Sequence, residues 1–167
     1  MKKFCIIIGI SLWQMWAFAA HVPVGKAQTV GQHFLSQQSQ FSGILPVQLN
    51  LQLVYTEGVK DNNQKSNEDG ITYFYVFNAG NQGFVIVAGD DRVLPILGYA
   101  DKGSFDPENI PINCKKWLEG YKNEIRYVVE NEIIATEEIE QKWSDYYDNV
   151  KQKQRKGAVA PLLTTTW

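Results

Sequence analysis

Three residues beyond the first twenty could supply a cysteine–histidine catalytic pair: Cys114, His21 and His33. Such chemistry requires a thiolate, an imidazole within hydrogen-bond reach that takes the thiol proton, and a third group that orients the imidazole. Cys114 begins an amphipathic segment, which favours a half-buried packing role. A helix N-terminus also lowers the pKa of a thiol, so the sequence leaves the reactivity of Cys114 open.

The carboxylate pair Asp90-Asp91 is a second candidate, since it could bind a metal ion or exchange protons. Either role requires converging ligands or a base, and no histidine is near in the sequence. A turn between two strands accounts for the pair more simply, with the carboxylates accepting backbone N–H groups and Arg92 pairing locally. We therefore predict a turn, and we expect no metal site and no cofactor.

The polar connection at residues 98–111 is a third candidate, because it carries two apolar residues, Phe105 and Ile110. Pro107 stiffens the same segment. Exposed apolar anchors on a stiff loop lose little conformational entropy when they dock on a partner. This pattern predicts a binding loop with Phe105 and Ile110 as its anchors.

A fourth candidate is the cationic run at residues 151–156, which contains four basic side chains. Such a run can bind an anionic surface or be cut by a protease. The plainest interpretation is a solvated helix end followed by a linker.

The elements that would position these groups form an α+β fold. Alternating apolar residues and short apolar runs predict about four strands. Their connections are short, so neighbouring strands are expected to be antiparallel. The strands span residues 49–55, 71–78, 83–88 and 94–99. Helical spacing predicts three helices packed on one face of this sheet, at residues 26–37, 113–131 and 136–150. Thr136 is expected to cap the last of them. The polar residues 56–70 are predicted to be a loop.

Residues 1–20 have the composition of a secretory signal peptide. Two lysines precede an apolar stretch that ends near Trp16, and an A-x-A motif places the cleavage site at Ala19 and Ala20. The stretch is shorter than the roughly 20 residues of a membrane span. We therefore expect a secreted or periplasmic protein with no membrane association after cleavage.

Charge and cysteine content narrow the possible partners. The chain carries a net charge of −2, and removal of two lysines with the signal peptide leaves 14 basic residues against 18 acidic ones. This mild acidity argues against a nucleic-acid partner. Of the two cysteines only Cys114 would remain, so no internal disulfide can form. We expect a monomer that is stabilised by its core alone.

Four consecutive motifs resemble a known family: Tyr75-Val76-Phe77-Asn78, Gly83-Phe84-Val85-Ile86-Val87, Gly89-Asp90-Asp91-Arg92 and Pro95-Ile96-Leu97-Gly98-Tyr99. They are similar to the propeptide of the streptopain family of secreted, papain-like cysteine peptidases, which also occurs as a stand-alone Spi protease inhibitor domain. The segments 103–106 and 117–121 add to the resemblance. It covers residues 27–167 and is weakest over residues 38–70.

The resemblance implies three segments: a signal peptide at residues 1–20, a propeptide-like inhibitor domain at residues 21–150, and a linker at residues 151–167. The end of the linker resembles the opening of a streptopain-type catalytic domain, which is absent. Since the catalytic residues of the family belong to that domain, the chain is expected not to be an enzyme. In the zymogens of the family a cleavable segment joins propeptide and enzyme, so processing is predicted near Arg155, Lys156 and Gly157.

The resemblance further implies that the chain inhibits a streptopain-like cysteine peptidase by blocking its active-site cleft. The predicted inhibitory contact comprises Gly103, Ser104, Phe105, Asp106, Pro107, Asn109 and Ile110. Two alternatives stay open. The chain could be the pro-region of a truncated zymogen, or an exported binding or adhesion module without a protease partner.

Overall fold

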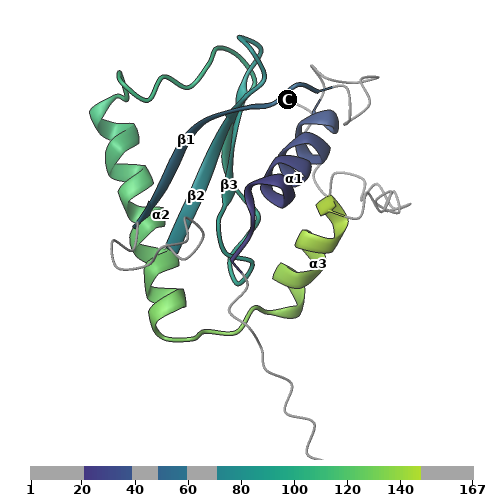
Figure 1. Cartoon of the computed structure of the whole chain (residues 1–167), viewed down its shortest axis with the longest axis vertical. Helices are drawn as coiled ribbons and strands as arrows, with labels where there is room; N and C mark the ends of the chain where they lie inside the picture. The colour runs from purple at the N-terminus through teal and green to yellow at the C-terminus, as the bar shows by residue number, and fades with distance from the viewer. Residues whose placement is uncertain (1–20, 39–48, 60–70, 148–167) are drawn as a thin grey trace, which may run out of the picture.

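A computed structural model describes residues 21–38, 49–59 and 71–147 of the chain (Figure 1). Within this part, three helices and four strands follow one another as α1 (Val24–Ser36), β1 (Gln52–Val59), β2 (Ile71–Asn78), β3 (Phe84–Ala88), β4 (Ile96–Ala100), α2 (Ile112–Glu130) and α3 (Glu137–Tyr147). The predicted signal peptide, the linker at residues 151–167 and the processing site at Arg155–Gly157 lie outside the described residues.

The four strands form one antiparallel sheet in the order β1-β2-β3-β4. In the centre of the sheet, Val76 of β2 is paired with Ile86 of β3. All residues of β2 from Tyr73 to Asn78 are buried, because both faces of this central strand are covered. Covered faces also explain why β2 reads as a continuous apolar run instead of an alternating one. The predicted α+β class with a four-stranded antiparallel sheet is confirmed.

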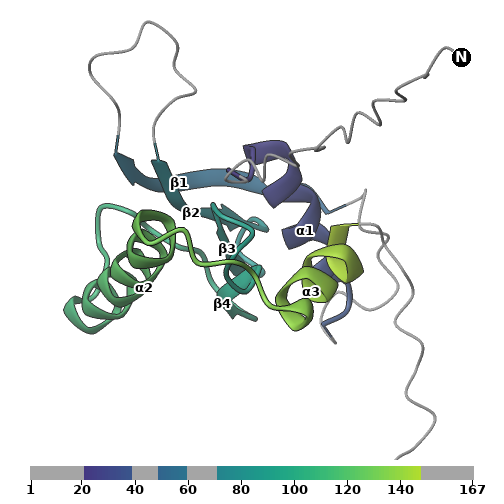
Figure 2. The same ribbon diagram turned by 90° about the horizontal axis from the view of Figure 1, so that it is seen from below.

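The helices cover both faces of the sheet, which differs from the prediction that they pack on one face (Figure 2). Alternate side chains of a strand point to opposite faces. Val85 and Val87 of β3 face α1, where a methyl group on Gly31 would lie 3.0 Å from Val85 Cγ1. On the other face, Trp117 of α2 packs against Gly98 of β4 so closely that any side chain at position 98 would collide with its ring. Helix α3 packs beside α1.

The element boundaries follow the prediction closely except at β1. This strand begins at Gln52 and continues to Val59, into a polar stretch predicted to be a loop. Its polar residues are accommodated because β1 is an edge strand, in which Glu57 pairs through its backbone with Phe74 while Thr56 and Gly58 are exposed. At the start of α3, Thr136 is the predicted cap: its Oγ1 accepts the N–H of Ile139 at 3.4 Å.

No helix in the described residues is long and apolar enough to span a bilayer.

Candidate functional site

The loop between β4 and α2 contains the predicted inhibitory contact, and its centre is attached to the core. Phe105 is only 7% exposed, and its ring packs against those of Tyr55 and Phe84 at centroid distances of 5.9 and 5.6 Å. The side chain of Asn78 makes two hydrogen bonds to the Phe105 backbone: its Nδ2 donates to the carbonyl at 3.0 Å, and its Oδ1 accepts the N–H at 2.9 Å. The prediction that Phe105 is an exposed anchor for a partner is therefore wrong; it anchors the loop to its own domain.

Beyond Phe105 the chain forms an exposed tip, which we define as Pro107, Glu108 and Asn109. Asp106 organises this tip: its Oδ1 accepts the N–H of Glu108 at 3.0 Å, and its Oδ2 accepts the amide Nδ2 of Asn109 at 2.7 Å. Both bonds lower the pKa of the Asp106 carboxyl, and the bond from the Asn109 side chain has the larger effect. The tip is thus held in one conformation by bonds made within the loop.

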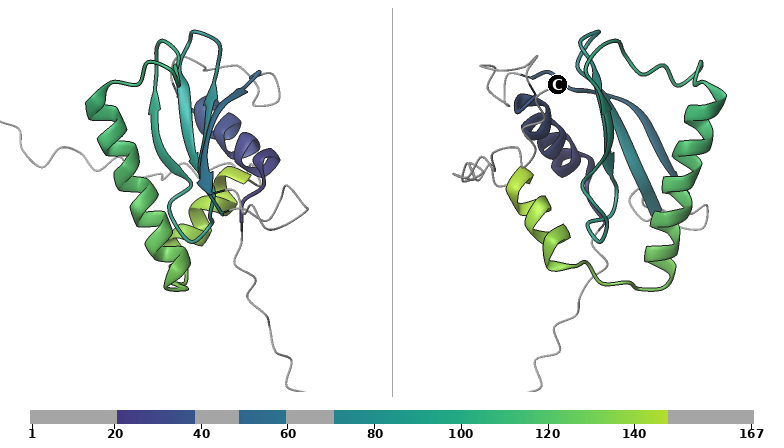
Figure 3. Two further views of the ribbon diagram at one scale, coloured as in Figure 1. Left: turned by 60° about the vertical axis from the view of Figure 1, so that its left-hand side comes forward. Right: turned by 180° about the vertical axis from the view of Figure 1, so that it is seen from behind.

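The start of the loop is hydrogen-bonded to the turn between β2 and β3. The N–H of Gly103 donates to the carbonyl of Asn81 at 3.1 Å, and Gly103 and Gln82 form an isolated bridge. Gly103 has a φ of 76°, a left-handed conformation that favours glycine. The turn and the loop therefore lie together at one end of the sheet, the end at which α2 begins (Figure 3).

The seven predicted contact residues divide into three groups. The exposed group has five members: Gly103, Ser104, Asp106, Pro107 and Asn109. Ile110 is half-buried and packs against the core, and Phe105 is buried. Two residues of this candidate site were not among the predicted contacts. Glu108 belongs to the tip, and Asn78 holds the loop from 27 positions earlier in the chain. The motif Tyr75-Val76-Phe77-Asn78 contains Asn78, but its partner cannot be predicted locally because the contact joins segments distant in the sequence.

A network of polar side chains below the loop holds α2 against β1. The Tyr55 hydroxyl donates to Glu57, whose carboxylate also pairs with Lys122 of α2 at 2.8 Å. The pKa of Tyr55 is raised to about 12, mainly by burial and to a smaller extent by the hydrogen bond to Glu57. Because the Tyr55 ring also packs on Phe105, this network supports the anchor of the loop.

Asp90 and Asp91 lie at the opposite end of the sheet, where the prediction of a structural turn is confirmed. Asp90 accepts the N–H of Arg92 at 3.0 Å and pairs with its guanidinium at 2.7 and 2.8 Å. Asp91 lies 3.6 Å from the ammonium of Lys26, yet burial raises the pKa of the Asp91 carboxyl. Among the described residues no group of histidine, cysteine, aspartate and glutamate could hold a metal ion.

Cys114 and His33 do not meet. Cys114 lies in the first turn of α2 and is half-buried, and His33 lies on α1, across the sheet from α2 (Figure 2). The His33 Nδ1 is hydrogen-bonded to the carbonyl oxygen of Tyr146 in α3. The imidazole of His33 therefore helps to join α1 to α3 and is not a base for the Cys114 thiol.

Comparisons with known proteins find one family model and several curated relatives. A family model described as Spi protease inhibitor matches residues 19–125. The thiol protease/hemagglutinin PrtT of Porphyromonas gingivalis is 28% identical over 167 residues, which is 99% of this chain and 17% of that protein. Streptopain of Streptococcus pyogenes is 44% identical over 62 residues, which is 37% of this chain and 15% of streptopain.

The chain thus spans less than a fifth of the length of the curated relatives it matches. No solved structure gives a significant match.

Proposed function

Because the chain belongs to the Spi protease inhibitor family and is a propeptide-like inhibitor domain, we propose that it inhibits a streptopain-type cysteine peptidase. In this proposal the folded domain docks over the active-site cleft of the peptidase and blocks it. The exposed tip of the loop between β4 and α2 makes the inhibitory contact, together with Ser104.

The observation that carries this proposal is the construction of the loop. Phe105 and Asn78 attach its centre to the core, while Asp106 shapes a tip whose three residues are exposed. A side chain that is already ordered loses little entropy on binding, so a few well-placed polar contacts can contribute much of the affinity. This arrangement favours docking of a preformed surface over folding upon binding.

We also propose that the chain has no peptidase activity of its own. The separation of Cys114 and His33 by the sheet supports this proposal, since a thiol nucleophile requires a base within hydrogen-bond reach.

Export of the chain is a further part of the proposal. The lysine-led apolar stretch and the A-x-A motif support cleavage after Ala19 or Ala20 and a secreted or periplasmic location. Cleavage near Arg155–Gly157 is proposed on the cationic run and on the resemblance to zymogens in which a cleavable segment joins propeptide and enzyme. Mass spectrometry of the protein recovered from the culture would identify both termini.

A second candidate is the pro-region of a longer zymogen. It is favoured by the alignment with PrtT, which extends over 99% of this chain and therefore includes segments beyond the family model. In that case the same loop would act on a catalytic domain in its own chain. Sequencing of the locus downstream of the codon for Trp167 would separate the two forms.

The proposal is tested by measuring inhibition by the purified chain. The targets are the thiol-dependent peptidase from the secreted fraction of the producing organism and streptopain itself. We expect competitive inhibition at or below micromolar concentration. The double variant Glu108→Ala/Asn109→Ala should raise the inhibition constant at least about ten-fold, or about 1.4 kcal/mol, because it removes the exposed polar groups of the tip.

The matched control removes the same two residue types from the exposed surface of α2, as Asn123→Ala/Glu124→Ala. Both double variants should keep the wild-type midpoint in urea, and the control should keep the wild-type inhibition constant. Absence of inhibition by the wild-type chain would overturn the proposed function. Equal inhibition by wild type and tip variant would move the contact away from the tip.

A further inference from the structure

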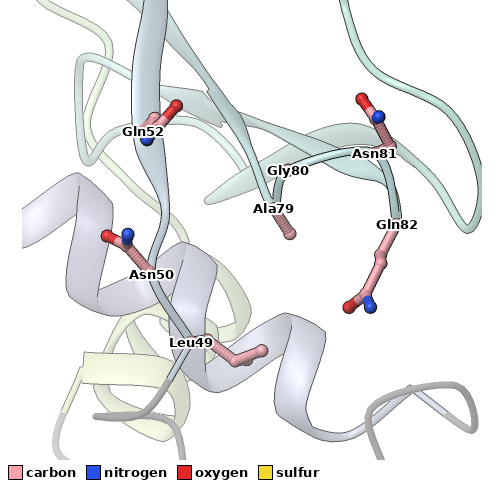
Figure 4. A pocket seen from close by; sticks show the side chains of 7 residues that line it. All are labelled: Leu49, Asn50, Gln52, Ala79, Gly80, Asn81 and Gln82. Carbon is pink, nitrogen blue, oxygen red and sulfur yellow. The ribbon is translucent and has the colours of Figure 1, made fainter.

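A second feature lies beside the loop, at the same end of the sheet. It is an open pocket of about 480 Å³ between residues 49–52, which lead into β1, and the turn at residues 79–82 (Figure 4). The β1–β2 pairing begins at Gln52 and Asn78, and beyond this pair the two chain segments separate. The hydrogen bond from the Gly103 N–H to the Asn81 carbonyl joins the pocket wall to the start of the loop.

Both walls of the pocket are held in place by hydrogen bonds. On one side, two glutamines of α1 bind the backbone that leads into β1: Gln32 Nε2 donates to the Leu49 carbonyl at 2.7 Å, and Gln28 Nε2 donates to the Leu51 carbonyl at 2.9 Å. On the other side, the Ala79 N–H donates to the Gly83 carbonyl at 2.9 Å. The pocket is therefore preformed.

The polar lining of the pocket consists of side-chain amides. Four exposed residues supply these amides: Asn50, Gln52, Asn81 and Gln82. None of their side chains is hydrogen-bonded to another described residue. Gln28 and Gln32 differ, because their amides are occupied by backbone carbonyls. None of the described residues that line the pocket is charged, and Leu49 and Ala79 supply apolar surface.

An uncharged lining of amides selects a particular kind of ligand. Each carboxamide presents two N–H donors and one carbonyl acceptor, so it can pair with both polar groups of a peptide unit. A neutral site offers no counter-charge to an anion or a cation, and burying an unpaired charge there would be costly. The main chain of an extended polypeptide, in which N–H and C=O groups alternate, matches this lining.

We propose that the pocket accepts an extended main-chain segment of the inhibited peptidase, as a second contact beside the loop tip. This inference rests on the proposed function, since it names a further part of the surface that the peptidase covers. The hydrogen bond between Gly103 and Asn81 holds the two contacts in one geometry, so a single partner surface can engage both.

The test compares three double variants in the inhibition assay. Asn50→Ala/Gln82→Ala removes one amide from each wall. Asn50→Asp/Gln82→Glu keeps the size and the acceptors, removes the donors and adds two negative charges. We expect both to raise the inhibition constant at least ten-fold without a change in the urea midpoint. The matched control, Asn123→Ala/Gln141→Ala, removes two amides that bond only within helices α2 and α3, and it should inhibit like wild type.

The outcomes separate the two proposals. If the wild-type chain inhibits no peptidase, the proposed function fails and the pocket contact fails with it. If the wild type inhibits and both pocket variants match the control, only the pocket contact is overturned.

Nuclear magnetic resonance of the chain supplies a direct readout. Addition of a peptidase inactivated by substitution of its catalytic cysteine, with the cleft left open, should shift the side-chain amide signals of Asn50, Gln52, Asn81 and Gln82. If soluble oligosaccharides shift these signals and the peptidase does not, the pocket is a carbohydrate site and the proposal is overturned.

Discussion

The turn at Asp90 and the loop at Asp106 lie at opposite ends of the sheet and use the same local hydrogen bond. In each, the aspartate Oδ1 accepts the N–H of the residue two positions later, at 3.0 Å. Their surroundings differ. Asp90 is 5% exposed, and its Oδ2 accepts a hydrogen bond from the guanidinium of Arg92. Asp106 lies at the surface, and its Oδ2 accepts a hydrogen bond from the side-chain amide of Asn109.

This difference shows how burial assigns different roles to one motif. At Asp90 the paired charges are largely shielded from water, so loss of either partner would leave the other charge uncompensated. At Asp106 the bonds shape a tip whose remaining polar groups face solvent. The apolar residue that supports the tip, Phe105, is directed into the domain, so the loop can be rigid without exposing a large aromatic side chain.

The largest expected effect comes from removing the support of the loop. Phe105→Ala should lower the free energy of unfolding by about 3–5 kcal/mol, because it deletes a buried ring that packs on Tyr55 and Phe84. Urea unfolding would measure it. Ile112→Ala, at a residue that is 67% exposed, is the control and should cost less than about 0.5 kcal/mol. A comparably small loss for Phe105→Ala would place its ring at the surface.

The second prediction sets the two aspartates against each other. Asp90→Ala should lower the free energy of unfolding by about 3 kcal/mol, because it leaves the mostly buried Arg92 guanidinium without a partner. Asp106→Ala, the same change at the exposed turn, should lower it far less. Asp90→Asn should recover part of the loss, since it keeps an acceptor for the Arg92 N–H. Equal losses for Asp90→Ala and Asp106→Ala would contradict the role assigned to burial.

The smallest expected effect is the acid titration of the tip. Hydrogen bonds to the ionised carboxyl lower the pKa of Asp106. The ionised carboxyl therefore stabilises the tip fully at a pH above the ordinary aspartate pKa, and this stabilisation is lost as the pH falls through the lowered pKa of Asp106. The carboxyl ¹³C signal of Asp106 should therefore titrate below the ordinary range, and the N–H signal of Glu108 should follow it. In Asn109→Ala the titration should move back toward the ordinary pKa. A wild-type titration at the ordinary pKa would show that the two bonds do not form in solution.

Much of the fold could be predicted from local patterns. β2 was predicted at residues 71–78 and has those bounds, because an apolar run between polar segments marks a central strand. The helices, the Asp90–Arg92 turn and the cap at Thr136 likewise depend on neighbouring residues. The motifs on β2, β3 and β4 also predicted the family, and the match of the family model to residues 19–125 confirms it.

The errors share one cause, which is contact between distant segments. The prediction that Phe105 is exposed was wrong because the local sequence of a polar loop does not show whether an aromatic side chain points to solvent or into the core. Pairing with Asn78, 27 residues earlier, and packing on Tyr55 decide its direction. The extension of β1 through Glu57 likewise depends on β2, which supplies the backbone partners that a polar segment cannot provide for itself.

Local patterns in the sequence predicted most of the elements, their antiparallel pairing and the family, because residue spacing, turn residues and sequence motifs are local properties of the chain. Tertiary structure alone decided which faces the helices cover, which of the two aspartate turns is buried, and which groups at the end of the sheet are free to bind. The amides of the pocket show the physical reason. Asparagine and glutamine carry the same amide group at every position, and only packing determines that Gln28 and Gln32 donate to the Leu51 and Leu49 carbonyls while Asn50 and Gln82 are exposed.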